Sequence, residues 1–488
     1  MSILRTLLFA IFSMLFVLMS CKRYKHEEFG NDLAQEYKNK RYKNFDTTAY
    51  FEIFKVELKQ QEQKIHHPKW LQEIYSSPDK GLTVLGTHLL NGGVDSLQKY
   101  LSQSVMHGFD PEYFHSSEIK TLLQTVKEAK FKDINEMYPV LSRLEILSAD
   151  GLINYANFLR YGAVNAKSLY GRYFDKIDRP DLIRSQQALD QLDLIAFLEE
   201  IQPKSEDYLN FQKLLSHSEL TAAQREKVYI NMERLRWLTA AYPDKYVMVN
   251  IPEFKLKMVD EGRVTGEMKV CVGETENEGF ARSGNNHETP ILSGKIDRMQ
   301  VNPVWNIPKS IAAKEILNKL KENPAYLEEH NMVAYNKAKQ LVDAKTIDWD
   351  SDSISVNDFA FKQNPGLDNS LGRIKFIFDN PYAIYLHDTP AKGAFGQRNR
   401  AVSHGCVRVA DPAGLVTFLV NDVKQTEKIK EEISGQDTNS RWVSLKQPIK
   451  VFLAYYTAKV EDGKLKEIQD VYGYDMRLLE KFSRVMAK

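Results

Sequence analysis

Two histidines and a cysteine occur within twenty residues of one another in the second half of the chain: His387, His404 and Cys406. A nucleophilic cysteine needs a base to raise its thiolate fraction, and it needs N–H donors for the oxyanion that develops on the substrate. Either histidine could supply the base. Gly405 lets the backbone approach a substrate closely, and the N–H groups of Gly405 and Cys406 can serve as donors. The stretch therefore indicates cysteine catalysis, with a small buried cysteine and structural histidines as the alternative.

The elements around these residues are expected to hold them at a strand end and in a turn. Residues 383–387 read as a strand, so His387 lies where a loop can fold back. Asp411 and Pro412 are typical of a helix N-cap followed by proline at the first helical position, which predicts a helix through Phe418. Cys406 is therefore expected in a turn just ahead of a helix.

The wider pattern predicts an α+β chain of two main domains. Apolar residues recur at helical spacing in the first half, which predicts an all-helical scaffold domain over residues 46–240. After Pro243 the period changes to two, and Asp-Glu-Gly and Glu-Asp-Gly turns appear at 260–262 and 461–463. We therefore expect a β-rich domain, a mixed sheet or sandwich, over residues 241–478, and a tail over 479–488.

An insertion interrupts the β-rich half at residues 308–370. Ser310 to Glu322 has helical spacing, with Ser310 as a plausible N-cap, and Asn323 and Pro324 end the helix. The insertion is predicted to be a helical cap that could sit over a site. A surface excursion without function is the alternative.

The amino terminus is typical of an export signal. Residues 7–19 are apolar except for Ser13, and this run is shorter than the roughly 20 residues that span a bilayer. It ends at Cys21, and the sequence Leu-Met-Ser-Cys resembles the lipobox of bacterial lipoproteins, in which this cysteine is lipidated. We expect a signal peptide over residues 1–20, a polar tether over 21–45, and an exported lipoprotein anchored to a membrane of the cell envelope and facing the periplasm.

Composition limits the other possibilities. Lys plus Arg is 66 and Asp plus Glu is 65, so the net charge of +1 argues against a nucleic-acid binder that relies on bulk positive charge. The three cysteines cannot form a disulfide framework, and no Cys/His zinc pattern occurs. Cys271 is predicted to be a buried structural residue.

The motif around Cys406 is similar to the signature of the L,D-transpeptidase catalytic domain, also called the YkuD domain. His387 is followed after fifteen residues by Ser403, His404, Gly405 and Cys406, then by an apolar residue and Arg408. Further segments resemble the large YcbB-like branch of that family, over roughly residues 80–478: Asn231–Leu238, Thr289–Pro290, Asn302–Pro308, Pro365–Gly366 and Leu371–Gly372.

The resemblance implies acyl transfer on peptidoglycan stem peptides, with no metal or organic cofactor. Cys406 would attack the carbonyl of the third residue of a tetrapeptide stem and expel the terminal D-Ala. His387 would be the general base and then the acid, with its ring oriented by the backbone carbonyl of Asp388. Gly405 would supply an oxyanion N–H with His404 in support, and a second stem's side-chain amine would complete a 3→3 crosslink.

Three residues are candidates for substrate binding: Arg408, Trp305 and Ser403. The planar fork of Arg408 suits a substrate carboxylate, although many short family members have Asn there, and a structural ion pair is the alternative. Trp305 could line the donor groove or pack as a core aromatic. The large branch also has a peptidoglycan-binding module, for which the segment 216–227 is too short, so wall docking would depend on the scaffold, the cap or the lipid.

Two other functions remain open at this stage. A cysteine hydrolase or L,D-carboxypeptidase of stem peptides, similar to NlpC/P60 enzymes, also needs Cys and His, but such enzymes usually place Cys well before His. A catalytically silent wall-binding lipoprotein would not need both His387 and Cys406. The sequence does not fix the diamino acid at stem position three, the acceptor, the choice of membrane, the oligomeric state or protein partners.

Overall fold

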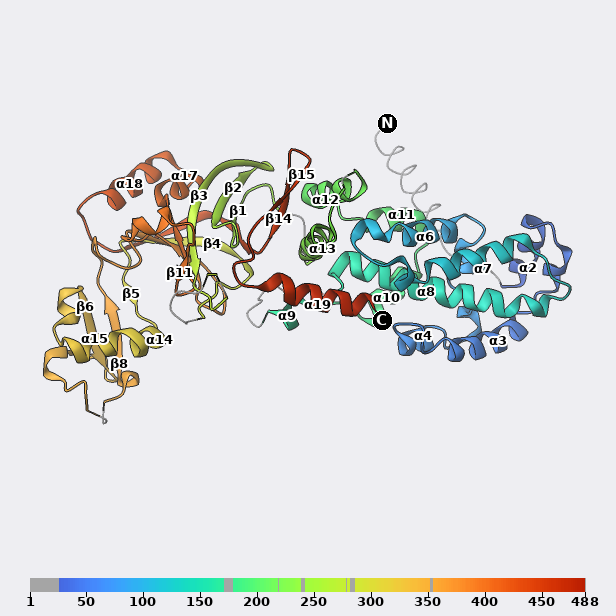
Figure 1. The fold of residues 1–488 in the computed structure, drawn as a ribbon, viewed down its shortest axis with the longest axis horizontal. Helices are drawn as coiled ribbons and strands as arrows, with labels where there is room; N and C mark the ends of the chain where they lie inside the picture. The colour runs from blue at the N-terminus through green and yellow to red at the C-terminus, as the bar shows by residue number, and fades with distance from the viewer. Residues whose placement is uncertain are drawn as a thin grey trace, which may run out of the picture.

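The computed structural model describes residues 26–170, 179–217, 219–237, 242–277, 279–280, 286–351 and 354–487. The expected signal peptide and Cys21 lie outside the described residues. In Figure 1 a helical region, a β-rich region and a small mixed region follow one another along the long axis. None of the described helices combines the length and apolar character needed to cross a membrane.

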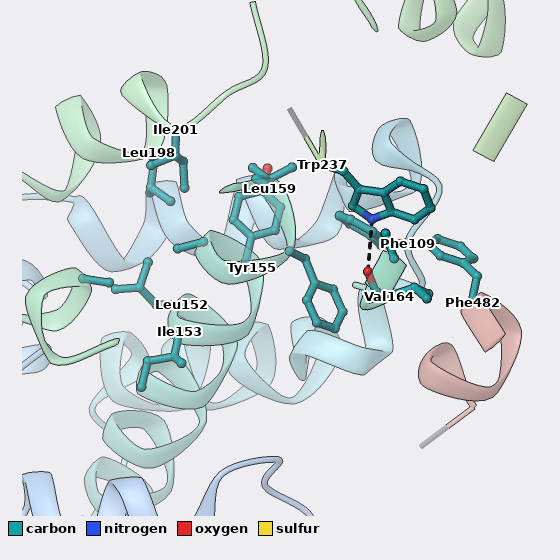
Figure 2. Close-up of a cluster of buried hydrophobic side chains, with 14 of the residues drawn as sticks. Phe109, Leu152, Ile153, Tyr155, Leu159, Val164, Leu198, Ile201, Trp237 and Phe482 are labelled. Carbon is teal, nitrogen blue, oxygen red and sulfur yellow. Dashed lines mark hydrogen bonds between the residues drawn. The ribbon is translucent and has the colours of Figure 1, made fainter. Parts of the chain in front are cut away.

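The first half is helical, as predicted. Leu152, Ile153 and Leu159 lie buried along α8 and pack in the cluster drawn in Figure 2, where Trp237 donates its indole N–H to the Val164 carbonyl at 3.0 Å. The helices are α2 (His26–Glu36), α3 (Thr47–Gln60), α4 (Pro68–Ile74), α5 (Leu85–His88), α6 (Gly93–Ser102), α7 (Ser116–Glu128), α8 (Tyr138–Tyr161), α9 (Ala166–Leu169), α10 (Leu182–Leu189), α11 (Leu194–Glu200), α12 (Glu206–His217) and α13 (Ala222–Arg236). Short 3₁₀ turns join them: η1 (Lys40–Asn44), η2 (Pro78–Lys80), η3 (Ser104–His107), η4 (Pro111–Phe114) and η5 (Ile134–Glu136).

The expected tether is wrong for residues 26–45. Helix α2 and turn η1 lie within this range, and Phe29, Leu33 and Tyr42 are buried. Tyr42 donates its hydroxyl hydrogen to the Val126 carbonyl at 2.8 Å. A few apolar residues at helical spacing are enough to dock this segment, and the surrounding Lys, Glu and Asn residues conceal them in a composition-based prediction.

The β-rich half is built on a mixed sheet whose described strands run in the order β11-β3-β12-β10-β9-β4-β13-β1-β2. Strand β2 also pairs with β3, so the sheet curls back on itself. The strands are β1 (Tyr246–Asn250), β2 (Lys255–Asp260), β3 (Arg263–Gly273), β4 (Leu292–Val301), β9 (Ile374–Phe378), β10 (Tyr385–His387), β11 (Ala401–Ser403), β12 (Val407–Val409) and β13 (Arg441–Ala454). The turn η9 (Lys392–Gly396) and helices α17 (Pro412–Leu419) and α18 (Val423–Ser434) complete this region, and a separate hairpin pairs β14 (Ala458–Glu461) with β15 (Lys464–Glu467).

The insertion is a small α+β unit, not the helical cap that the sequence analysis expects. Its helix begins at Lys309 behind Pro308, so Ser310 is not the N-cap, and it ends at Asn323 as expected. It consists of α14 (Lys309–Ile311), the π-helical turn η6 (Ala312–Ile316), α15 (Leu317–Glu322), α16 (Tyr326–Glu329), and a sheet of β5 (Trp305–Asn306), β8 (Phe359–Gln363), β6 (Met332–Asn336) and β7 (Leu341–Val342), with turns η7 (Ala344–Thr346) and η8 (Val356–Asp358). Its own apolar core includes Leu320, Trp349 and Phe361. We call residues 305–363 the cap.

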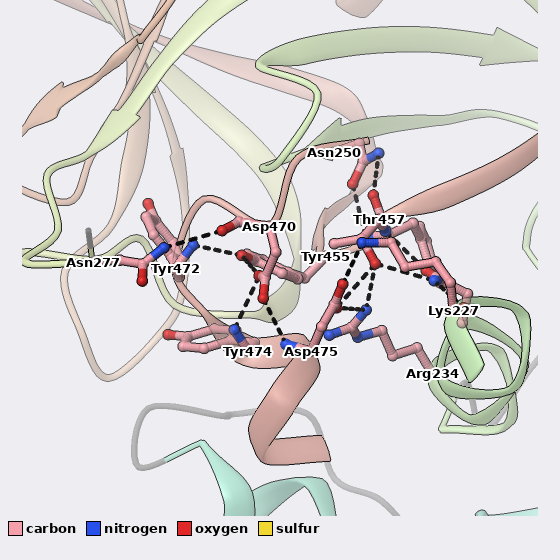
Figure 3. Close-up of polar contacts among 12 residues, drawn as sticks. Lys227, Arg234, Asn250, Asn277, Tyr455, Thr457, Asp470, Tyr472, Tyr474 and Asp475 are labelled. Atoms are coloured by element: carbon pink, nitrogen blue, oxygen red, sulfur yellow. Dashed lines mark hydrogen bonds and ion pairs between the residues drawn. The ribbon is translucent and has the colours of Figure 1, made fainter. Parts of the chain in front are cut away.

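The carboxyl-terminal residues form helix α19 (Tyr474–Met486), which corrects the expected tail. Phe482 of this helix packs against Phe109 of the helical half, with ring centroids 6.1 Å apart. Figure 3 shows the polar junction at its start, where the Asp475 carboxylate pairs with Arg234 at 2.7 Å and with Lys227 at 2.5 Å. Helix α19 therefore ties the β-rich half to the helices.

Candidate active site

The strand register places four of the relevant side chains in one row across the sheet. Lys375 on β9 is the Cα partner of His387 on β10, His387 is the partner of Arg408 on β12, and Arg408 is the partner of Cys271 on β3. Paired residues on neighbouring strands direct their side chains to the same face. The row therefore brings a base, two cations and a thiol together from four strands. Cys271 is fully buried in it, as predicted.

Cys406 lies in the turn between β11 and β12, immediately before Val407, and helix α17 begins six residues after it. The predicted N-cap is confirmed, because the Asp411 carboxylate accepts a hydrogen bond from Gly414 N at 2.8 Å. Gly405 has a φ of +111°, a conformation that L residues rarely adopt, so glycine is required there. Its carbonyl accepts from the Thr289 hydroxyl at 2.8 Å, which fixes the turn against the neighbouring segment.

Ser403 shapes this turn through its hydrogen bonds. It is buried, it donates its hydroxyl hydrogen to the Cys406 carbonyl at 2.6 Å, and its oxygen accepts from the Gly405 N–H at 3.2 Å. The hydroxyl of Ser403 is used within the turn, and the Gly405 N–H is engaged by Ser403 in this structure. The expected roles of Ser403 in substrate binding and of the Gly405 N–H in the oxyanion site stay predictions.

His387 is buried at the end of β10 with its ring fixed by backbone. Its Nδ1 lies 2.5 Å from the carbonyl oxygen of Asp388, the orienting contact that the resemblance implies. Burial and the Arg408 guanidinium lower the pKa of His387 to about 4, against the opposing effect of the Asp388 and Leu371 carbonyls. The imidazole is therefore neutral at physiological pH and can accept a proton.

The thiol of Cys406 is protonated in this resting arrangement. Burial raises its pKa to about 11, although hydrogen bonds from Tyr385 and the charges of Arg408 and Lys375 act in the opposite direction. Its Sγ lies 3.8 Å from the Ala383 carbonyl oxygen. Among the described residues no hydrogen bond joins it to His387. Catalytic contacts are often loose without substrate, so the absence of this hydrogen bond is compatible with a catalytic pair.

Lys375 and Arg408 are cations without an anion. Lys375 is only 9% exposed and lies over the rings of Tyr385 and Trp442 at 5.7 and 5.6 Å. The Nε of Arg408 is buried without a hydrogen-bond partner, and burial lowers the pKa of both groups. Among the described residues neither forms an ion pair. Sequence analysis missed Lys375, and the only signal was its strand pairing with His387, which requires the register to be known.

Trp305 connects the base of the cap to the nucleophile. It is half-buried and packs on the cap core. Its side chain hydrogen-bonds Tyr385, and Tyr385 in turn hydrogen-bonds Cys406, while burial raises the pKa of the Tyr385 hydroxyl. Trp305 therefore contacts the reactive centre through Tyr385, which the sequence analysis did not identify.

His404 points to the cap. Its Nε2 lies 2.6 Å from Oε1 of Glu315 on η6, and its ring lies 5.1 Å from that of His287. The His287 Nδ1 is in turn 2.8 Å from a Glu274 carboxylate oxygen. Glu274, His287 and His404 offer nitrogen and oxygen atoms within 4.8 Å of one another, a set that could hold a cation beside Cys406. In place of the expected oxyanion support, His404 bonds the cap to the catalytic turn.

Comparison with known families agrees with this arrangement. A sequence model described as the L,D-transpeptidase catalytic domain, YkuD, matches residues 244–428, and one described as the Scaffold domain matches residues 69–215. A Haemophilus influenzae protein named "Putative L,D-transpeptidase" is 31% identical over 345 residues, which are 68% of this chain and 67% of that protein. The chain belongs to the L,D-transpeptidase family, whose members use a cysteine and act on peptidoglycan stem peptides.

Proposed function

We propose that this protein is a peptidoglycan L,D-transpeptidase that forms 3→3 crosslinks through an acyl-enzyme on Cys406. The observation that carries the proposal is the shared row of His387 and Arg408 beside Cys406, together with the unpaired cation Lys375. A neutral buried base, a thiol and unpaired positive charge are what acyl transfer on a carboxylate-bearing peptide requires.

In the proposed first half-reaction the Cys406 thiol turns from the Ala383 carbonyl toward His387 and gives it a proton. The sulfur forms a bond to the carbonyl carbon of the third stem residue. The bond to the nitrogen of D-Ala then breaks, and His387 returns the proton to that departing amine. The Cys406 N–H is the candidate oxyanion donor, since Ser403 already engages the Gly405 N–H.

In the second half-reaction a side-chain amine of another stem attacks the thioester. His387 takes one proton from this amine and returns it to the sulfur as the thiol leaves. The product is an amide between two third-position residues. If water replaced the amine, the same acyl-enzyme would yield a tripeptide, which is the carboxypeptidase alternative.

Lys375 and Arg408 are the proposed receptor for a carboxylate of the donor stem. Both cations act on Cys406, as their effect on its pKa indicates, so a carboxylate bound between them would hold the scissile carbonyl beside the sulfur. Such a carboxylate would also supply the anion that both cations lack. A buried charge without a partner is costly, so its retention favours a binding role.

The cellular setting is part of the proposal. The apolar run at residues 7–19 and Cys21 support export and lipid attachment, which would hold the enzyme on an envelope membrane beside its polymer. Cys21→Ser should leave activity on soluble fragments intact and release the protein from membranes, as fractionation would reveal.

The activity is tested with disaccharide-tetrapeptide fragments and mass spectrometry of the products. We expect crosslinked dimers joined through two third-position residues, with one D-Ala released per crosslink, and neither product with Cys406→Ala. Tripeptide without dimers would favour the carboxypeptidase. Dimers formed equally by Cys406→Ala would contradict the proposal.

A further inference from the structure

A second cluster of metal-ligating side chains lies in the helical half. Asp150 sits in the middle of α8, and its side chain is fully buried. His66 comes from the segment between α3 and α4, and His115 comes from the start of α7. The long-range approach of these segments hides the cluster from any sequence pattern.

Both imidazoles contact one carboxylate oxygen. His66 Nδ1 lies 2.8 Å and His115 Nε2 lies 2.9 Å from Oδ2 of Asp150. All three atoms lie within 4.8 Å of one another. Zinc binds imidazole nitrogen and carboxylate oxygen at about 2.0–2.2 Å, so shifts of a few tenths of an ångström would place an ion among them.

The surroundings hold each ligand in position. The other oxygen of Asp150 accepts the backbone N–H of His66 at 3.0 Å, which fixes the orientation of the carboxylate. The ring of Tyr113 lies against the His66 ring, with centroids 3.9 Å apart. His115 has a φ of +60°, a conformation uncommon for a residue other than glycine, and it directs the ring toward Asp150.

The charge balance also favours a cation. Asp150 is a buried carboxylate, and among the described residues the groups within ion-pair distance of it are the two imidazoles, with no Lys or Arg. Glu233 on α13, by contrast, has a guanidinium partner in Arg236. The three hydrogen-bond contacts offset part of the cost of burying this carboxylate, and a divalent ion would supply the positive charge that no Lys or Arg provides.

We propose that His66, His115 and Asp150 bind a divalent transition-metal ion, with zinc as the expected occupant. The imidazoles are 12% and 11% exposed, so solvent can reach the site and supply a fourth ligand. The ion would join the α3–α4 connection and the start of α7 to the centre of α8. It is a structural site in the scaffold, independent of the reaction at Cys406.

The test is a zinc titration of the metal-free protein against a chromophoric chelator, with His66→Gln and His115→Gln as variants. His217→Gln is the control, because His217 is exposed on α12 and bonds only within its own turn of helix. His404→Gln removes the other candidate cluster. We expect His217→Gln and His404→Gln to retain one tight equivalent. The two scaffold variants should bind at least about tenfold more weakly, the scale that even an outer-shell partner carries.

Cobalt binding to the wild-type chain is a second measurement, which does not depend on whether a variant folds. Cobalt in this triad should give visible bands of nitrogen and oxygen coordination without the intense thiolate charge-transfer band that binding at Cys406 would produce. It should also raise the melting temperature of the wild-type chain. A thiolate spectrum, or equal zinc affinity in wild type, His66→Gln and His115→Gln, would overturn the proposal.

Discussion

Two regions of the molecule differ in whether their buried charged side chains form ion pairs. At the end of α13, Arg236 and Glu233 are both fully buried and pair at 2.7 Å, and the Arg236 guanidinium also donates to the His107 carbonyl at 3.0 Å. In the sheet, Lys375 and Arg408 are buried or half-buried beside Cys406 and have no anionic partner among the described residues. The Glu233–Arg236 pair helps to hold the helical half together, whereas Lys375 and Arg408 beside Cys406 form no ion pair among the described residues.

The paired charges stabilise the fold, whereas the unpaired cations are proposed to bind substrate. Removing one partner of a satisfied buried pair leaves the other charge stranded, which destabilises the fold. Removing an unpaired cation relieves a desolvation penalty, so its retention needs another reason. In the proposed reaction that reason is the substrate carboxylate.

The largest effect is expected from the reacting pair itself. Cys406→Ala should reduce crosslinking by at least about 1,000-fold, since no nucleophile remains, and His387→Ala by about 100- to 10,000-fold, since the thiol loses its base. Product formation from tetrapeptide fragments is the measurement. The thermal melt of Cys406→Ala should match wild type, so that its loss of activity is not a loss of fold. Residual crosslinking within tenfold of wild type in Cys406→Ala would show that another residue is the nucleophile.

Substitution of Glu233, which pairs with Arg236, should lower the stability of the protein. Glu233→Ala leaves the Arg236 guanidinium buried without its carboxylate and removes an acceptor of the Val164 N–H at 2.7 Å. We expect a loss of about 3–5 kcal/mol in the free energy of unfolding, measured by denaturant titration. Lys319→Ala, which removes a surface pair with Glu322, is the control and should have no measurable effect. Equal effects of the two substitutions would show that the buried Glu233–Arg236 pair contributes no more to stability than an exposed pair does.

Substitution of the unpaired cations Arg408 and Lys375 should lower the activity of the enzyme. Arg408→Met and Lys375→Met should each lower the acylation rate by about 10- to 100-fold, the scale of one hydrogen bond to a charged group. Their melting temperatures should be unchanged or higher, because each substitution removes a desolvated charge. A lower melting temperature with unchanged acylation would mean that these cations are structural.

The last prediction concerns the pH dependence of the reactivity of the Cys406 thiol. Burial raises the pKa of Cys406 to about 11, so the thiolate fraction of the free enzyme should rise roughly tenfold per pH unit between about pH 6 and pH 9. The iodoacetamide alkylation rate of Cys406 should follow this rise without a plateau. Lys375→Met should slow it further, since Lys375 lowers the pKa of the thiol. A plateau below pH 8 would indicate a thiolate already formed with His387 as its partner.

The sequence predicted the parts of the molecule that depend on local pattern. The helical half, the alternating strands, the Asp411 cap and the burial of Cys271 are confirmed. The signature around Cys406 led to the correct family, because its residues are almost contiguous. Each of these features depends on a few residues that are close together in the sequence.

The missed features depend on long-range contacts. Lys375 reaches the site only through the β9–β10 register, and His66 meets Asp150 across 84 positions. The hydrogen bond from the Ser403 hydroxyl to the Cys406 carbonyl was also missed, because it depends on the conformation of the turn. Helix α2, the cap sheet and α19 were missed because their apolar residues are few and stand among charged ones.

The proposal that Arg408 binds a carboxylate of the donor stem is tested most directly by changing the enzyme and the substrate together. The rate of acyl-enzyme formation is measured by intact-protein mass spectrometry. Wild type and Arg408→Met are compared with three donors: the free tetrapeptide stem, one amidated at its terminal carboxylate, and one amidated at the third residue. We expect that with one amidated donor Arg408→Met causes no further loss of rate, because the cation and its carboxylate act as one unit. Equal losses caused by Arg408→Met with all three donors would contradict the proposal.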